Sequence, residues 1–224
     1  MSRRRKVVLG IIAVPILLVV AFILRVTVFV PTFDVPSIKT TAEYQNGALI
    51  DRAWALPVAK TYDHRLVSQT NGSVCGPSSL ANILRSAGDA NASQATVLDG
   101  SGKCGTGMCW FGLTLDEVAE LARRKGKKVT VHRDLDLAAF REQLKRTNDP
   151  TRRYLINFHR GLLFGKGTGH HSPIAGYLEA EDLVFVLDVN ASFGPWLVSS
   201  ERLFKAMDSI DSSSGKKRGL LEIE

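Results

Sequence analysis

The 224 residues of this chain carry a formal net charge of +7, and four of the positive charges lie in the first six residues. Hydrophobic residues make up 45% of the chain and charged residues 23%, a composition typical of a folded globular protein. The other basic residues form no pattern interleaved with aromatic side chains, which argues against nucleic acid as a partner. The three cysteines are too few for a disulfide framework.

Residues 7–30 are almost wholly apolar, and the uninterrupted part, 7–24, is long enough for a membrane span of about 18–20 residues. The basic residues precede it, so the positive-inside rule keeps the N-terminus in the cytoplasm. We expect residues 1–30 to form a basic N-terminus and a single-pass signal anchor in the cytoplasmic membrane. A cleaved signal peptide is the alternative, although the stretch exceeds the usual apolar region of about 7–15 residues and no small-x-small cleavage site follows it.

The rest of the chain would then lie on the extracytoplasmic (periplasmic) side. Residues 31–50 contain prolines, serines and threonines without a period, which predicts a linker that spaces the domain from the bilayer. Residues 51–224 have the length of one ordinary domain.

Helical patterns precede most of the strand patterns in that domain. Leu80, Ile83 and Leu84 have helical spacing, and a capping box of Thr114 and Glu117 opens a second helix that ends at Gly126. Between them, residues 93–112 are glycine-rich and irregular. Strands are then predicted over 128–132, 154–159, 172–178, 183–188 and 219–223, with helices around 137–144 and over 201–207. This order indicates an α+β fold with helices and sheet segregated.

Cys75 stands immediately before the first of these helices. A helix N-terminus offers unpaired N–H groups and about half a positive charge, which lower the pKa of a thiol and favour the thiolate. Position alone does not separate such a nucleophile from a buried structural cysteine, the commoner role of an isolated one. Gln69, six residues earlier, could add a side-chain amide to the Cys75 N–H as a second donor to an oxyanion.

A predicted hairpin places a histidine beside a carboxylate. His170 and His171 stand at the start of one apolar strand, and Asp188 ends the next strand along the chain. A short turn joins the two strands, so their pairing brings Asp188 back beside His170. A carboxylate at the end of an apolar strand is costly unless it is paired, and an imidazolium is a suitable partner. With Cys75, these residues have the order of nucleophile, base and orienting carboxylate.

Cys104 and Cys109 lie in the glycine-rich stretch. They could form a disulfide outside the cytoplasm or bind a soft metal through thiolates, but two cysteines lack the four ligands of structural zinc. We expect a disulfide or no role, and we assign no metal site. His64, His132 and His159 have no partner that the sequence reveals, and we treat them as structural.

Several short motifs occur in one order over about 50–224. They are Gln-Thr-Asn-Gly-Ser-Val-Cys-Gly-Pro-Ser-Ser-Leu (69–80), Asn-Phe-His-Arg (157–160), Gly-Thr-Gly-His-His-Ser-Pro-Ile-Ala-Gly-Tyr (167–177), Val-Leu-Asp-Val (186–189) and Met-Asp-Ser-Ile-Asp (207–211) through Arg218-Gly219. In these motifs and in the His-to-Asp spacing the chain resembles the catalytic domain of phytochelatin synthases.

The resemblance implies a papain-like cysteine protease fold with Cys75 as nucleophile, His170 as base and Asp188 as its orienter. The family pattern Gly-His-x-Ser-Pro selects His170, and His171 takes the variable position. Gln69 matches the oxyanion-hole glutamine of the family.

Three further residues match family positions that recognise the glutamyl end of the substrate: Arg160, Asp211 and Arg218. An arginine suits a carboxylate through bidentate pairing, and an aspartate suits an amino group. The chain departs from the family where Ala191 replaces an arginine three residues after Asp188, in the glycine-rich loop, and in lacking the cysteine-rich C-terminal region of the plant enzymes.

The activity implied is that of a glutathione γ-glutamylcysteinyltransferase. Cys75 attacks the Cys–Gly bond of glutathione, glycine leaves, and the γ-Glu-Cys group passes to water or to a second glutathione. Ala191 and the short chain favour water. The protein itself would need no cofactor, because Cd or Zn ions would arrive as glutathione thiolate complexes. A homodimer is compatible with the sequence.

Two other functions stay open at this level. A papain-like cysteine peptidase would act on peptides, although Arg160, Asp211 and Arg218 exceed what an extended peptide needs. A non-enzymatic, membrane-tethered metal-binding module would use Cys104, Cys109 and the His170–His171 pair instead.

Overall fold

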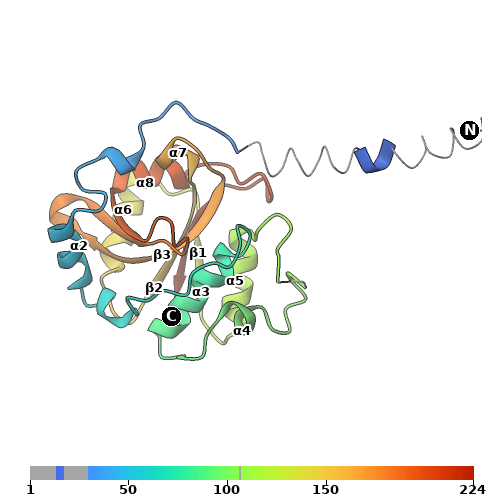
Figure 1. The fold of residues 1–224 in the computed structure, drawn as a ribbon. Coiled ribbons are helices and arrows are strands. Elements are labelled where there is room, and N and C mark those ends of the chain that lie inside the picture. Colours follow the sequence, from blue (N-terminus) through green and yellow to red (C-terminus); the bar gives the residue numbers. More distant parts are fainter. Residues whose placement is uncertain (1–13, 18–29, 106) are drawn as a thin grey trace, which may run out of the picture.

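The computed structural model describes residues 14–17, 30–105 and 107–224. Its centre is one six-stranded sheet (Figure 1) in the order β1-β6-β2-β3-β4-β5, with each pair of neighbours antiparallel. The strands are β1 (Val129–His132), β2 (Arg153–His159), β3 (Gly169–Leu178), β4 (Leu183–Leu187), β5 (Pro195–Ser199) and β6 (Gly219–Ile223).

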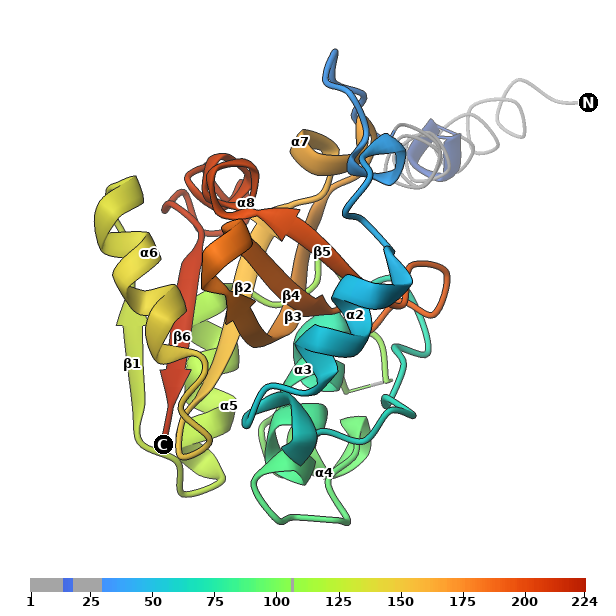
Figure 2. The ribbon, with the colours of Figure 1, turned by 90° about the vertical axis from the view of Figure 1, so that its left-hand side faces the viewer.

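Helices cover both faces of this sheet. One core contains residues of α2 (Gly47–Trp54), α3 (Cys75–Ser86), α4 (Gln94–Leu98) and α5 (Leu115–Arg124). The second core contains residues of α6 (Leu137–Arg146), α7 (Gly161–Phe164) and α8 (Ser200–Met207). Figure 2 shows α3 and α4 on one side of the strands and α6 and α8 on the other.

The alternation of side chains along β2 explains how one strand serves both cores. Tyr154, Ile156 and Phe158 belong to the core of α6 to α8, whereas Leu155 belongs to that of α3 to α5. Successive strand residues point to opposite faces, so Asn157 lies on the same face as Leu155, toward α3. A buried polar side chain is thereby placed beside the helix that begins at Cys75.

The predicted hairpin is confirmed. β3 and β4 pair antiparallel, with Tyr177 opposite Val184 and a register shift between Ile174 and Tyr177. The connection is a 3-10 turn, Glu179–Glu181, closed by Asp182 with a positive φ of 55°. The shift bends the two strands and sets where their open ends lie, at His170 and at the residue that follows β4.

The predicted helix after the capping box is also confirmed. The Thr114 side chain accepts from the Glu117 N–H and the Glu117 carboxylate accepts from the Thr114 N–H, and α5 then runs to Arg124. Gly126 has the positive φ expected after a helix end. Four of the described helices and strands were not predicted. These are α2, β5, α7 and α4, the last of which lies inside the stretch expected to be irregular.

Most of the predicted membrane anchor lies outside the described residues. Within the described ranges, no helix is long and apolar enough to cross a membrane. The segment 31–50, expected to be a linker, contacts the domain. Thr32 forms a β-bridge with Lys166, and Ile38 and Tyr44 are buried in the core that also contains Phe140.

Candidate active site

Cys75 is the first residue of α3, and Val74 before it provides no side-chain cap. The free N–H groups of the first helical turn therefore lie next to the thiol, as the sequence predicts. Gly76 follows because α3 is pressed against α5 at this point: a Cβ at position 76 would lie 2.7 Å from Cγ2 of Val118. Close helix packing thus fixes the backbone on which the thiol is presented.

His170 and Asp188 meet at the open end of the β3–β4 hairpin. His170 Nε2 lies 3.1 Å from Asp188 Oδ1, and the aspartate side chain has no exposed surface. This contact leaves Nδ1 as the ring atom free to exchange a proton with the thiol. The hairpin argument from sequence is confirmed in its geometry.

His171 also reaches the thiol, from the other face of β3. Its Nδ1 lies 3.7 Å from Cys75 Sγ, and its ring contacts the amide of Asn157 on β2. Two imidazoles therefore flank one sulfur atom. The family pattern singled out His170 and gave His171 the variable position, so no role at the thiol was expected for His171. Both histidines reach Cys75 because they stand at the beginning of β3, at the open end of the hairpin, where α3 packs against the strand.

The electrostatics of this cluster favour an ion pair. Burial opposes ionisation of Cys75, but the charge of His170 and the hydrogen bonds of His170 and His171 hold the pKa of its thiol well below the usual range. Burial also opposes a charge on His170, yet the carboxylate of Asp188 and the sulfur of Cys75 raise its pKa above its usual value. Thiolate and imidazolium are thus mutually stabilising, which is the reactive state of a cysteine nucleophile.

Asp188 is held by more than His170. Arg160 Nη2 donates to both carboxylate oxygens at 2.7 Å, the Trp196 indole N–H donates at 3.1 Å, and the Asn190 N–H donates at 2.9 Å. Burial disfavours the carboxylate, but His170 and Arg160 hold its pKa well below the ordinary range. The orienting group is therefore ionised and fixed in place.

The surroundings of Arg160 differ from the prediction that it contacts substrate. Its guanidinium lies against Asp188 and stacks over the Phe193 ring at 3.9 Å, and it is absent from the cleft lining described next. The structure thus places Arg160 behind the candidate triad, whereas Asp211 and Arg218 do face the cleft.

A cleft of about 550 Å³ opens over Cys75. Its lining includes Asp211 and Arg218, 3.7 Å apart between Oδ1 and Nη2, and both residues are otherwise buried. Gly169 leaves space for the guanidinium of Arg218, because a Cβ at position 169 would lie 2.4 Å from Arg218 Nη1. The rim is apolar and includes Trp110 and Phe111, whose side chains are largely exposed.

Gln69 lies near the nucleophile loop and outside the cleft lining. Its amide donates to the Asn71 carbonyl at 3.0 Å, and its own carbonyl oxygen is buried without a partner. The backbone N–H of Gln69 donates to the Val189 carbonyl at 2.8 Å, which ties this loop to the residue after Asp188. Its assignment to the oxyanion hole stays a prediction.

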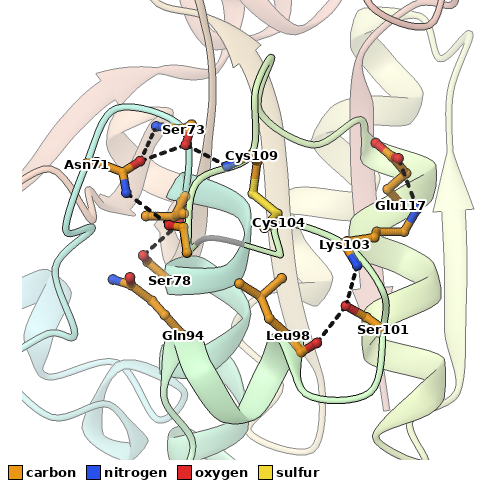
Figure 3. The surroundings of a disulfide bond; sticks show 12 residues. Asn71, Ser73, Ser78, Gln94, Leu98, Ser101, Lys103, Cys104, Cys109 and Glu117 are labelled. Carbon is orange, nitrogen blue, oxygen red and sulfur yellow. Dashed lines mark hydrogen bonds and ion pairs between the residues drawn. A yellow bond between two sulfur atoms is a disulfide. The ribbon is translucent and has the colours of Figure 1, made fainter.

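Cys104 and Cys109 form a disulfide, one of the two outcomes expected (Figure 3). The loop that they close is joined to the loop before the nucleophile. The Cys109 N–H donates to Ser73 Oγ at 3.0 Å, and the Asn71 amide donates to the Gly107 carbonyl at 3.2 Å. The disulfide therefore fixes the rim of the cleft to the backbone that precedes Cys75.

The disulfide occupies both thiols on which a metal-binding module would depend. Among the described residues, no group of three or more His, Cys, Asp or Glu side chains is arranged to hold a metal ion. Three residues that contribute to the site were assigned no role from the sequence: Asn157, His171 and Trp196. His171 had a signal in its adjacency to His170, and Asn157 had one in the Asn-Phe-His-Arg motif. Trp196 had none, because it meets the site through strand pairing.

We expect Asp188→Asn to destabilise the protein in a pH-dependent manner. The depressed pKa of Asp188 means that its stabilising contribution is full above about pH 4, the value of an unfolded aspartate, and is lost as the pH falls below it. At pH 6 the variant leaves Arg160 buried without a counter-charge, which costs about 3–5 kcal/mol of unfolding free energy. Urea unfolding at pH 6 and pH 3 checks this. A difference between wild type and variant that stays constant with pH would contradict it.

Known proteins share parts of this sequence. The phytochelatin synthase family model matches residues 103–220, just over half of the chain, which includes His170 and Asp188 and begins after Cys75. Over 116 residues the chain is 37% identical to glutathione gamma-glutamylcysteinyltransferase 1 of Arabidopsis thaliana, covering 50% of this chain and 24% of that protein. Over 187 residues it is 28% identical to glutathione gamma-glutamylcysteinyltransferase 1 of Lotus japonicus, covering 71% of this chain and 35% of that protein.

The chain thus spans about a quarter to a third of the length of these relatives. Among solved structures, the peptidase domain of Streptococcus ComA, a bi-functional ABC transporter, has a TM-score of 0.50 at 21% identity and covers 71% of this chain and 96% of that one. That likeness supports the papain-like fold alone. From the match over 103–220, the chain belongs to the phytochelatin synthase family.

Proposed function

We propose that the chain is a cysteine enzyme that cleaves the Cys–Gly bond of glutathione and carries the γ-glutamylcysteinyl group as a thioester on Cys75. One observation carries this proposal. The thiol flanked by His170 lines the same cleft as Asp211 and Arg218. The names of the relatives, glutathione gamma-glutamylcysteinyltransferases, give the same substrate and the same transferred group.

The charges on Cys75 and His170 set the order of the reaction steps. The Cys75 thiolate attacks the carbonyl carbon of the Cys–Gly bond, and the developing oxyanion takes the Cys75 N–H as one donor, with the Gln69 amide as the expected second. The protonated His170 then gives its proton to the departing glycine nitrogen, the C–N bond breaks, and the thioester remains. Asp188 keeps the His170 ring oriented throughout.

The second half-reaction regenerates the thiolate. His170, now neutral, removes a proton from the acceptor as it attacks the thioester, and the sulfur leaves as thiolate. Water as acceptor gives γ-glutamylcysteine, and a second glutathione gives a phytochelatin. We propose that water is favoured, since Ala191 offers no charged group to a second glutathione. Heavy-metal ions would enter as glutathione thiolate complexes, as part of the substrate.

The Asp211–Arg218 pair in the cleft suits the glutamyl end of glutathione. Arg218 carries a guanidinium whose Nε has no hydrogen-bond partner in the described structure, and Asp211 lies beside it. The α-carboxylate and α-ammonium groups of a γ-glutamyl residue have the charges that complement this pair. A cleft of about 550 Å³ lies within the usual range for small-molecule sites.

Glycine release by the purified protein tests the proposal. With glutathione, the wild type should release glycine, and Cys75→Ala should lower the rate by at least about 1,000-fold because the thioester cannot form. Mass spectrometry of the products identifies the acceptor: γ-glutamylcysteine reports water and its oligomers report glutathione. Hydrolysis of unrelated peptides with no glycine released from glutathione would instead favour a peptidase.

Arg218 and Arg160 should behave differently. Arg218→Gln should raise the KM for glutathione by about 10- to 100-fold, the usual value of a hydrogen bond to a charged group. The same substitution should raise the KM for glutathione with an amidated α-carboxylate by less, because this substrate lacks the carboxylate that would pair with Arg218. Arg160→Gln, the matched control, should lower kcat through Asp188 with little change in KM. An equal increase in KM for amidated and natural glutathione in Arg218→Gln would contradict the assignment of Arg218 to the α-carboxylate.

We further propose that the domain lies on the extracytoplasmic side of the cytoplasmic membrane. The Cys104–Cys109 disulfide supports this location, because disulfides persist in oxidising compartments. A thiol reagent that does not cross membranes, applied to intact cells, should label Cys75 in the wild type and nothing in Cys75→Ala. Labelling that requires cell lysis would place the domain in the cytoplasm.

A further inference from the structure

His171 lies in the candidate active site in a position that the proposed triad does not use. Its side chain lines the cleft, only 2% of the residue is exposed, and its Nδ1 is 3.7 Å from the sulfur of Cys75. A second imidazole against a nucleophilic thiol could act as a rival base, as a donor to the thiolate, or as a spectator. The hydrogen bonds on its far side distinguish these roles.

Arg218 sets the orientation of the Asn157 amide. Arg218 Nη1 lies 2.7 Å from Asn157 Oδ1, and a guanidinium nitrogen can only donate. The atom of Asn157 that faces Arg218 is therefore its carbonyl oxygen, which accepts. The amide nitrogen, Nδ2, must point the other way, toward β3.

Asn157 in turn sets the tautomer of His171. Asn157 Nδ2 lies 2.6 Å from His171 Nε2 and 3.4 Å from Nδ1, so Nε2 is the nearer partner. An amide nitrogen only donates, and two donors at 2.6 Å would repel each other. Nε2 must accept this hydrogen bond, and the ring proton therefore stays on Nδ1, the atom that faces Cys75 Sγ.

We infer that Arg218, Asn157 and His171 form a chain of hydrogen bonds that holds an N–H of His171 against Cys75, and that His171 stabilises the thiolate without accepting its proton. The two histidines then have different roles. His170, whose Nε2 is bound to Asp188, presents a free Nδ1 that takes and returns the proton. His171 presents a bound proton that cannot be displaced without breaking its contact with Asn157.

This role also links the proposed binding residue Arg218 to the nucleophile. The guanidinium proposed to bind the α-carboxylate of the γ-glutamyl group is the first member of the chain, and the last member contacts the reacting sulfur. His171 is thus a catalytic residue of the same site, and its assignment deepens the proposed function.

The test follows the ionisation of Cys75 without any substrate. Cys104 and Cys109 are joined, so iodoacetamide reports only Cys75 among the three cysteines of the chain. The other charged or titratable groups around the sulfur and the hydrogen-bond chain are His170, Asp188, Arg160, Asp211 and Arg218, and all are retained in the variants. The alkylation rate of the full chain is measured from about pH 4 to pH 9.

His171→Phe keeps a ring and removes the N–H. Its alkylation profile should move to higher pH by about one unit, a roughly tenfold loss of thiolate at acid pH, because a hydrogen bond to a charged group is lost. His171→Asn places an amide nitrogen near the position of Nδ1 and should restore most of the shift. His64→Phe is the matched control, since His64 is exposed and stacks on Trp54, and its profile should equal that of the wild type.

A second measurement is independent of how the variants fold. In the wild-type protein with ¹⁵N-labelled histidine, the His171 ring should show its proton on Nδ1 and none on Nε2. A proton on Nε2, or His171→Phe with the wild-type alkylation profile, would overturn the inference. If the wild type releases no glycine from glutathione while both results hold, the proposed substrate fails and the role of His171 stands.

Discussion

The buried carboxylate of Asp188 is the constraint on which the candidate site depends. A charge with no exposed surface is tolerated only when donors surround it, and this one receives bonds from a guanidinium, an imidazole, an indole N–H and a backbone N–H. Those donors come from Arg160 after β2, His170 on β3, Trp196 on β5 and the backbone of Asn190. Compensation of one charge therefore fixes the relative positions of three strands and the loop after β4.

The same compensation creates the reactive state of the nucleophile. Asp188 raises the pKa of His170, and the charged His170 in turn lowers that of Cys75, which also lies at the start of α3. Each of these three ionised groups is stabilised by the opposite charge of its neighbour. Such a chain of alternating charges favours the thiolate in a site that would otherwise disfavour any charge.

A second hydrogen-bonded chain approaches the sulfur from the cleft. It runs from Arg218, just before β6, through Asn157 on β2 to His171 on β3, and it lies on the opposite face of the sheet from Asp188. Both chains end on one atom because His170 and His171 stand at the beginning of β3, where α3 packs against the strand. The disulfide loop then fixes the apolar rim of the cleft to the segment that precedes Cys75.

The sequence by itself determined the local features. The capping box of α5, the β3–β4 hairpin and the meeting of His170 with Asp188 depend on residues close in the chain, whose spacing and type dictate their geometry. The family motifs selected the same residues. Only the tertiary structure decided that Arg160 lies against Asp188, that Asn157 and Trp196 join the site, and that His171 reaches the sulfur. These contacts depend on strand register and on where α3 packs against the sheet, and neither is encoded in local spacing.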